Sequence, residues 1–182
     1  MLRRCEQRPA ATLQRVRFAF DQRFAADLAR VEAALIDPAF VARLATLPKL
    51  GAPTLLDQRE DGRLIRQRIR YAFVGDLSSA VRAVVDPARL TWVEESTIDR
   101  ERHHTDFTIV PDHYGNLLAA HGTFQLEAAA GSGCRRTAEG EVRVSVPLVG
   151  RKVEAAIVSG LAEHAAAEEH VMQEWLDGAA HP

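Results

Sequence analysis

The stretch PLVGRKVEAAIVSGLAEHAAAEEHVMQEWL, residues 147–176, dominates the organisation of this chain. No other segment can continue as a helix for so long. Its apolar residues recur at helical spacing, which predicts one buried face made of Val149, Val153, Ile157, Leu161, Val171 and Trp175. A helix over 148–176 would be about 40 Å long at about 1.5 Å per residue. Because a domain of this size seldom contains so long a helix uncovered, we expect the rest of the chain to wrap around it.

The composition is that of an ordinary globular domain. Of the 182 residues, 47% are hydrophobic and 26% charged, which suits one domain with a single core. The net charge is -2, so no basic excess favours a nucleic-acid partner. The sequence contains neither a secretory signal nor an uninterrupted apolar run of about 18 residues. We therefore expect a cytoplasmic protein with no stable membrane insertion.

The first part of the chain predicts one strand followed by two short helices. Residues 1–13 are polar and show no period, which indicates a flexible lead-in. Residues 14–21 alternate apolar and polar side chains, as a half-buried strand does. Helical spacing then covers 25–36 and, after a break at Asp37 and Pro38, resumes around 40–47.

The middle of the chain predicts strand after strand. An Asp-Gly pair at 61–62 supplies the tight turn of a hairpin, and a short helical turn is expected within 76–85. The gaps between most of the strands are hairpin-sized, which favours an antiparallel meander because parallel pairing would need crossover elements. The six predicted strands are 53–59, 63–73, 90–97, 103–110, 117–128 and 135–146. We therefore expect one domain over 14–178 and a flexible tail at 179–182.

This order resembles the α+β helix-grip fold of the START-like, or SRPBCC, superfamily. The segment EVRVSVPLVGRKVE, residues 141–154, is similar to the strand-to-helix boundary of an uncharacterised bacterial family within it. The resemblance implies a curved seven-stranded antiparallel sheet wrapped around the C-terminal helix. The superfamily contains lipid and sterol carriers, hormone receptors, polyketide cyclases and aromatases, and a co-chaperone branch. It therefore implies only a tendency to bind hydrophobic molecules.

In such a grip, alternate residues of successive strands form the concave wall of a cavity. Small residues at the centre of two strands, at 120, 122, 138 and 140, would either let the sheet bend tightly or leave space for a guest. The alanine-rich helix also allows either close packing or a cavity. The predicted ligand-cavity residues are Ile65, Gln67, Ile69, Tyr71, Phe73, Trp92, Leu118, Ala120, Gly122, Phe124, Val142, Val144, Val153, Ile157, Leu161, His164 and Glu168.

Two polar residues interrupt the apolar face of the long helix. His164 and Glu168 are one turn apart on that face. In a cavity they could hydrogen-bond the polar end of a guest or exchange a proton with it. Alternatively, they satisfy each other at the edge of the helix. Other polar groups that could face the guest from the strands are Gln67, Tyr71 and Glu94.

No residues form a convincing metal or cofactor site. On a strand, His103 faces away from His104 and Asp106, and the two donors left on one side are too few for zinc. We interpret these three as exposed polar positions. Cys5 and Cys134 have no metal-ligand spacing and are expected to be unpaired thiols. Because no nucleophile motif is present either, we predict no cofactor, no metal and no identifiable catalytic residue.

The leading functional hypothesis is the binding or carriage of a hydrophobic small molecule, lipid, sterol or polyketide-like, between the sheet and the C-terminal helix. Under this hypothesis the protein is not an enzyme. One alternative is a cyclase- or aromatase-like enzyme that uses His164 and Glu168 as an acid–base pair. Another is a protein-interaction module with a filled cavity, as in the co-chaperone branch.

Overall fold

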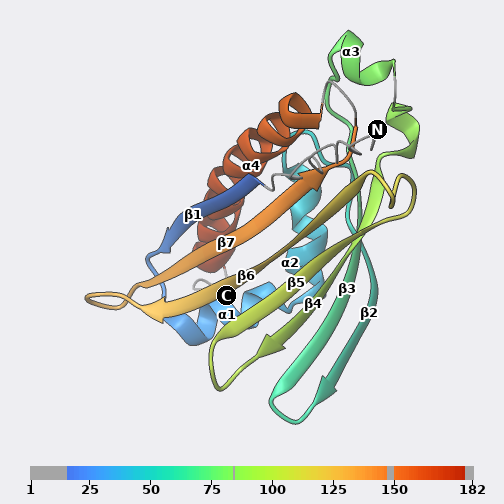
Figure 1. Ribbon diagram of the computed structural model, residues 1–182. Coiled ribbons are helices and arrows are strands. Elements are labelled where there is room, and N and C mark those ends of the chain that lie inside the picture. Colours follow the sequence, from blue (N-terminus) through green and yellow to red (C-terminus); the bar gives the residue numbers. More distant parts are fainter. Residues whose placement is uncertain (1–15, 84, 147–149, 179–182) are drawn as a thin grey trace, which may run out of the picture.

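The computed structural model describes residues 16–83, 85–146 and 150–178 (Figure 1). The strands are β1 (Val16–Phe24), β2 (Thr54–Asp61), β3 (Leu64–Ala72), β4 (Thr91–Asp99), β5 (His104–Pro111), β6 (Leu118–Ala128) and β7 (Cys134–Val144). The helices are α1 (Leu28–Leu35), α2 (Pro38–Arg43), α3 (Ser79–Arg82) and α4 (Gly150–Gly178). The predicted order of one strand, two short helices, six strands and a long helix is confirmed.

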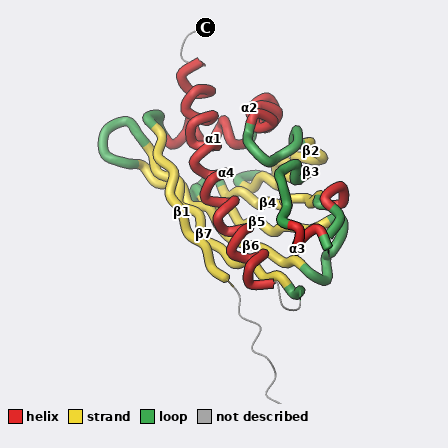
Figure 2. Tube along the Cα trace, turned by 90° about the horizontal axis from the view of Figure 1, so that it is seen from above, coloured by secondary structure: helices red, strands yellow, loops and turns green. Residues whose placement is uncertain are grey.

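The seven strands form one antiparallel sheet in the order β1-β7-β6-β5-β4-β3-β2. β1 and β2 are thus the two edges, although α1 and α2 connect them directly in the chain. Figure 2 shows the sheet curving around α4, with α1 and α2 on the same face as α4. α4 packs mainly on β1 and β7, and α2 contacts β2. The fold is therefore the expected α+β grip, in which all three of these helices cover the concave face.

Local sequence signals explain where the elements begin. The Asp27 carboxylate accepts a hydrogen bond from the backbone N–H of Arg30 at 2.9 Å and caps α1. Asp37 caps α2 in the same way through Ala39 at 2.8 Å. Gly62 has a φ of 60° in the turn between β2 and β3, the conformation that the Asp-Gly pair predicts. These signals place α1 and α2 directly after β1.

α4 buries a face that is rotated from the predicted one. Val171 is buried as expected, but Val153, Ile157, Leu161 and Trp175 are only half-buried, whereas Ala165, Met172 and Leu176 are fully buried. The reason is that α1 also packs against α4, so the helix is covered by the sheet on one side and by α1 on another. Val149 and the expected start of the helix at Leu148 lie outside the described residues.

The small residues in the sheet lie beneath aromatic rings. Gly122 in β6 pairs with Gly140 in β7. A Cβ on Gly122 would lie 2.9 Å from Cζ of Phe107, and a Cβ on Gly140 would overlap with the ring of Phe18. The rings thus occupy the space that the glycines leave. Together with seven of the seventeen predicted cavity residues they form an apolar cluster under α4. These seven are Leu118, Ala120, Phe124, Val142, Val144, Ile157 and Leu161.

Candidate functional site

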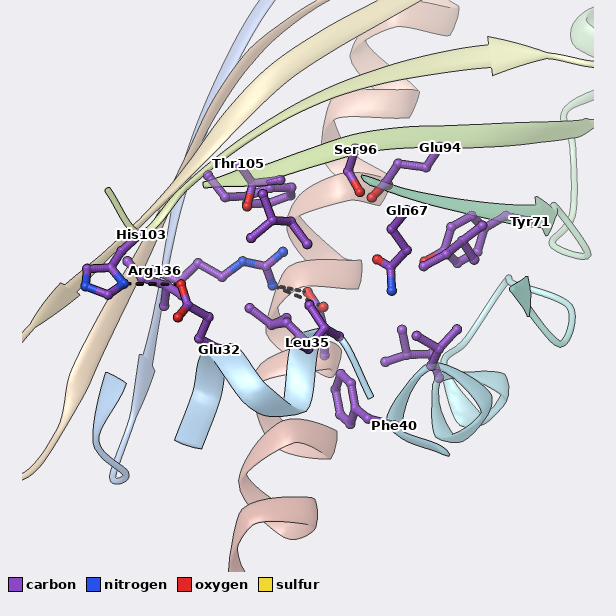
Figure 3. Close-up of a pocket in the computed structure, with 18 residues that line it drawn as sticks. Glu32, Leu35, Phe40, Gln67, Tyr71, Glu94, Ser96, His103, Thr105 and Arg136 are labelled. Atoms are coloured by element: carbon purple, nitrogen blue, oxygen red, sulfur yellow. Dashed lines mark hydrogen bonds and ion pairs between the residues drawn. The ribbon is translucent and has the colours of Figure 1, made fainter. Parts of the chain in front are cut away.

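A cavity of about 60 Å³ lies between the α1–α2 segment and strands β3 to β7, as the close-up in Figure 3 shows. Its helical side is apolar and consists of Leu35, Ile36, Phe40, Val41 and Leu44. The apolar residues on its sheet side are Ile69, Ile98, Phe124 and Leu126. Its polar lining residues are Glu32, Gln67, Tyr71, Glu94, Ser96, His103, Thr105, Arg136 and Glu168. Most of the polar side chains thus come from the sheet side, whereas Glu32 is on α1 and Glu168 on α4.

One part of the polar lining is an ion-pair network between β1, β7 and α4, in which Arg136 Nε stays buried without a hydrogen-bond partner among the described residues. Arg136 Nη1 donates to both carboxylate oxygens of Glu168, at 3.1 and 3.2 Å, and to Gln22 Oε1 at 3.2 Å. Gln22 Nε2 in turn donates to Glu168 at 3.1 Å. The guanidinium also stacks over the Phe124 ring at 3.9 Å. Although burial raises the pKa of Glu168, Arg136 and the other partners outweigh burial, and the net pKa lies below its ordinary value. Glu168 is thus ionised at neutral pH.

A second part of the polar lining has no internal partners. Tyr71 on β3 and Ser96 on β4 are 8% and 7% exposed, and Glu94 on β4 is half-buried. None of these three side chains has a hydrogen-bond partner among the described residues. Burial raises the pKa of Glu94 to about 7, with Arg136 opposing and Glu168 adding to the rise. Burial also raises the pKa of the Tyr71 hydroxyl. The structure thus places a carboxyl of raised pKa and the hydroxyls of Tyr71, Ser96 and Thr105 in the cavity wall.

A third polar contact ties α1 to the turn before β5. His103 Nδ1 lies 3.2 Å from the Glu32 carboxylate, which is buried, and Figure 3 draws this contact at one end of the cavity. We expected His103 to be an exposed strand residue, and this was wrong. Its φ of 52° places it in a left-handed turn, so its side chain leaves the strand alternation and reaches the helix.

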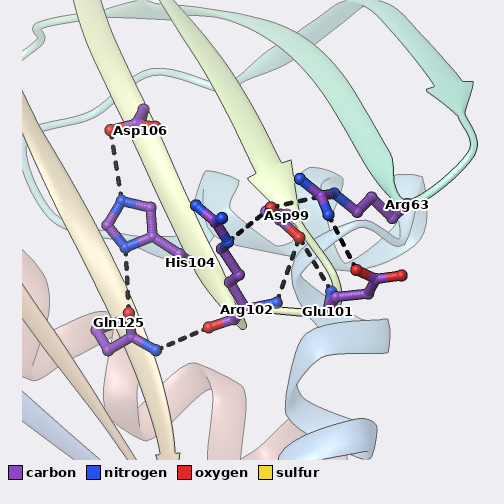
Figure 4. Close-up of polar contacts among 7 residues, drawn as sticks. All are labelled: Arg63, Asp99, Glu101, Arg102, His104, Asp106 and Gln125. Carbon is purple, nitrogen blue, oxygen red and sulfur yellow. Dashed lines mark hydrogen bonds and ion pairs between the residues drawn. The ribbon is translucent and has the colours of Figure 1, made fainter.

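The neighbouring polar residues face outward as expected. His104 lies 3.4 Å from Asp106 and 3.1 Å from Gln125 on the outer side of the sheet, and Figure 4 shows this group beside the Asp99–Arg63 contact. Within the described ranges, no three His, Cys, Asp or Glu side chains are grouped as a metal site requires. Cys134 is free and buried, and burial raises the pKa of its thiol to about 11. It therefore has little thiolate character at neutral pH.

The structure divides the predicted ligand-cavity residues between several places. Those that line the cavity are Gln67, Ile69, Tyr71, Phe124 and Glu168. Leu118, Ala120, Val142, Val144, Ile157 and Leu161 lie in the apolar cluster under α4, and Gly122 faces Phe107. Trp92 stacks on Tyr71 at 5.9 Å, Ile65 is fully buried, and Phe73 bridges to Leu50. Val153 and His164 are half-buried on α4.

His164 does not line the cavity, although Glu168 does. Burial lowers the pKa of His164, and Arg136 lowers it further while Glu168 opposes. The imidazole is therefore neutral at pH 7. The two residues thus differ in role, because Glu168 is hydrogen-bonded in the Arg136 network and His164 makes no hydrogen bond to it.

Sequence reasoning missed several lining residues for which a signal existed. Arg136 is in phase with Ala138 and Gly140 of β7, so strand alternation places it on the concave face. Ser96 is likewise in phase with Glu94 on β4 and pairs with the predicted wall residue Gln67. Ser96 and Arg136 were overlooked although the alternation that selected Gln67 and Tyr71 also places them on the concave face. Glu32 on α1 had no such signal.

The curved antiparallel sheet that grips α4 defines the helix-grip class of folds. Solved structures of this class are similar to the chain. The protein TTHA0849 from Thermus thermophilus has a TM-score of 0.66 at 16% identity over 90% of this chain and 99% of its own. The Zhui aromatase/cyclase from Streptomyces sp. R1128 has a TM-score of 0.62 at 11% identity, over 90% of this chain and 94% of its own. Norcoclaurine synthase from Thalictrum flavum has a TM-score of 0.59 at 18% identity, over 96% of both chains.

Residues 19–176 match the family described as "Protein of unknown function (DUF2505)", and the chain belongs to this family. No functionally curated protein is significantly similar to it in sequence. None of the helices in the described ranges is long and apolar enough to cross a membrane. At these low identities, the solved structures establish the fold alone.

Proposed function

We propose that this protein binds a small molecule with an apolar body and a polar end in the cavity beneath α1 and α2. The observation that carries the proposal is the group of three polar side chains, Tyr71, Glu94 and Ser96, that lies in the cavity wall without partners among the described residues. Buried polar groups are normally hydrogen-bonded by protein, water or ligand. The oxygens of these three side chains are open to the cavity, where a bound molecule would hydrogen-bond them in place of water.

The apolar side of the cavity supplies the other half of the recognition. Phe40, Val41 and Leu44 face the sheet from the helical segment, so an apolar body would be buried between α2 and β3. Ligand sites for drug-sized molecules commonly have about 300–1,000 Å³, so a sterol or long lipid requires α1 and α2 to move outward. Even a single benzene ring takes a cavity of about 150 Å³, so the present cavity also has to widen for a small ring compound. Support also comes from fold relatives, which are an aromatase/cyclase and a norcoclaurine synthase that has been solved in complex with dopamine and hydroxybenzaldehyde.

Native mass spectrometry and thermal unfolding test the proposal. The purified protein is screened against small ring compounds, fatty acids, sterols and polyketide-like aromatics. We expect one-to-one complexes, and a stabilisation of about 2.7 kcal/mol when the free ligand is at about 100 times its Kd. Ser96→Leu fills the cavity and should abolish binding, whereas Thr108→Leu, on the exposed outer face, should not. Uniformly ligand-free protein, or equal binding by Ser96→Leu, would refute the proposal.

A second candidate function is acid–base catalysis on the bound molecule. It is favoured by the pKa of about 7 of Glu94, which lets this carboxyl both give and accept a proton near neutral pH. Glu168 is less suited because Arg136 holds it ionised. Compounds that bind should then be converted, or exchange hydrogen in deuterated buffer, with wild-type protein but not with Glu94→Gln. Binding without any exchange would leave only the binding function.

The described surface does not favour the interaction-module hypothesis. The exposed large hydrophobic residues in the described ranges are Leu56, Val74 and Val110, and they lie on three different segments. Single exposed apolar side chains are normal on a protein surface and do not by themselves mark a docking surface.

A further inference from the structure

We infer that the polar end of the ligand is a protonated amine, seated against Tyr71, Glu94 and Ser96. This inference rests on the proposed function and names the class of molecule that the cavity takes. It follows from three features of the wall: its geometry, its balance of charges and the number of its free acceptors.

The geometry comes from the register of β3 and β4. Glu94 and Ser96 are two residues apart on β4, so both side chains point to the concave face. Glu94 pairs with Ile69, and Tyr71 is two residues beyond it on β3. Such diagonal neighbours lie about 7–8 Å apart, a gap that one small polar group can bridge. Figure 3 shows the oxygens of Ser96 and Glu94 next to each other above the cavity, with Tyr71 on the same side.

The charges in the cavity leave one carboxyl without a cation. Arg136 is engaged by Glu168, and Glu32 by His103. The ionisable groups that act on Glu94 are Arg136 on β7, whose positive charge has the larger effect, Glu168 on α4, and Tyr71 on β3. A ligand cation beside Glu94 would pair with a carboxyl that has no ion-pair partner among the described residues. A ligand carboxylate would instead place a further negative charge in a cavity that already holds the carboxyls of Glu32, Glu94 and Glu168.

The free acceptors are enough for an ammonium group. A primary ammonium has three N–H donors and no acceptor. The two oxygens of the Glu94 carboxylate and the hydroxyl oxygens of Tyr71 and Ser96 are acceptors that no described residue uses. In the free protein, burial keeps Glu94 protonated in part at neutral pH. Because an adjacent cation favours the ionised carboxylate, an amine that binds as the ammonium would release this proton to solvent.

A matched trio of probes tests the inference. Benzylamine, benzyl alcohol and benzoate share one ring, so they differ mainly in the charge and donors of the polar end. Isothermal titration at pH 7 should give the order benzylamine, benzyl alcohol, benzoate, with about tenfold between the first two. Repeating the benzylamine titration in buffers of different ionisation enthalpy should show net proton release.

Two variants separate the role of Glu94 from general effects on the cavity. Glu94→Gln keeps the shape of the side chain but cannot become charged. The affinity for benzylamine should therefore fall to that for benzyl alcohol, and the affinity for benzyl alcohol should change little. Glu95→Gln is the control, because Glu95 is on the outer face of the same strand, where it pairs with Arg68. Circular dichroism verifies that both variants are folded. Ser96→Ala removes one hydroxyl acceptor and leaves Glu94 in place. It should weaken the binding of benzylamine alone, and by less than Glu94→Gln does.

The outcomes distinguish the two proposals. If benzyl alcohol or benzoate binds the wild type as tightly as benzylamine, the amine inference is wrong while the cavity remains a binding site. If Glu94→Gln retains the preference for benzylamine, the inference is also wrong. If none of the three binds the wild type at millimolar concentration and the broader ligand screen also finds no complex, the proposed function fails as well.

Discussion

The wild-type protein is expected to lose stability as the pH rises because Glu94 becomes ionised. The Glu94→Gln variant should not show this loss. Glu94 is enclosed in the cavity wall, and burial raises its pKa from the ordinary 4.5 to about 7. A carboxyl whose pKa is higher in the folded state binds its proton more tightly there. Its contribution to stability is therefore fully present below pH 4.5 and is lost as the pH rises through about 7.

The magnitude follows from the two pKa values. Since each pKa unit corresponds to about 1.4 kcal/mol, the difference between 4.5 and about 7 amounts to about 3.5 kcal/mol over the whole range. Most of it, about 2.5 kcal/mol, falls between pH 5 and pH 8 by the same relation. Glutamine has the same shape and no proton to lose. The free energy of unfolding of the wild type should thus fall relative to Glu94→Gln by this amount.

Urea unfolding followed by tryptophan fluorescence measures the effect at pH 5, 6, 7 and 8. The difference between wild type and variant isolates Glu94, because groups such as Glu168 titrate in both proteins. Glu95→Gln is again the control, since an exposed ion pair on the outer face contributes less than about 1 kcal/mol. Parallel stability curves for the wild type and Glu94→Gln between pH 5 and 8 would refute a buried carboxyl of raised pKa.

Further predictions concern the network and the sheet. Arg136→Met should destabilise the protein by about 3–5 kcal/mol because it leaves Glu168 buried without its cation, and adding Glu168→Gln should recover part of that loss in a double-mutant cycle. Gly140→Ala should destabilise the fold by about 1–3 kcal/mol, since the added Cβ meets Phe18 and the neighbouring backbone, whereas Gly160→Ala in α4, with open space around it, should stabilise it by about 1 kcal/mol. Equal effects of the two glycine substitutions in thermal unfolding would contradict the close packing over β7.

The elements of the fold were predictable because their signals are local. Alternation of side chains marks the strands, and aspartates with following prolines or glycines mark the helix starts and the hairpin between β2 and β3. Where the structure differs from the local prediction, a long-range contact or an unusual backbone conformation is the cause. α4 is rotated from its apolar stripe because α1 covers a second side, and His103 turns inward because its backbone adopts a left-handed conformation.

Local periodicity was enough to specify the helix-grip architecture and the concave position of Gln67, Tyr71 and Glu168, since it fixes which side of a strand or helix is buried. The satisfaction of the polar groups, in contrast, depends on tertiary contacts. Arg136 takes Glu168 as its partner across 32 residues, and aromatic rings fill the space above the paired glycines. Glu94 is left unpaired among the described residues, in a cavity under α1 and α2. Hydrogen-bond partners depend on contacts between distant segments, which no local pattern specifies, and here those contacts place the candidate site.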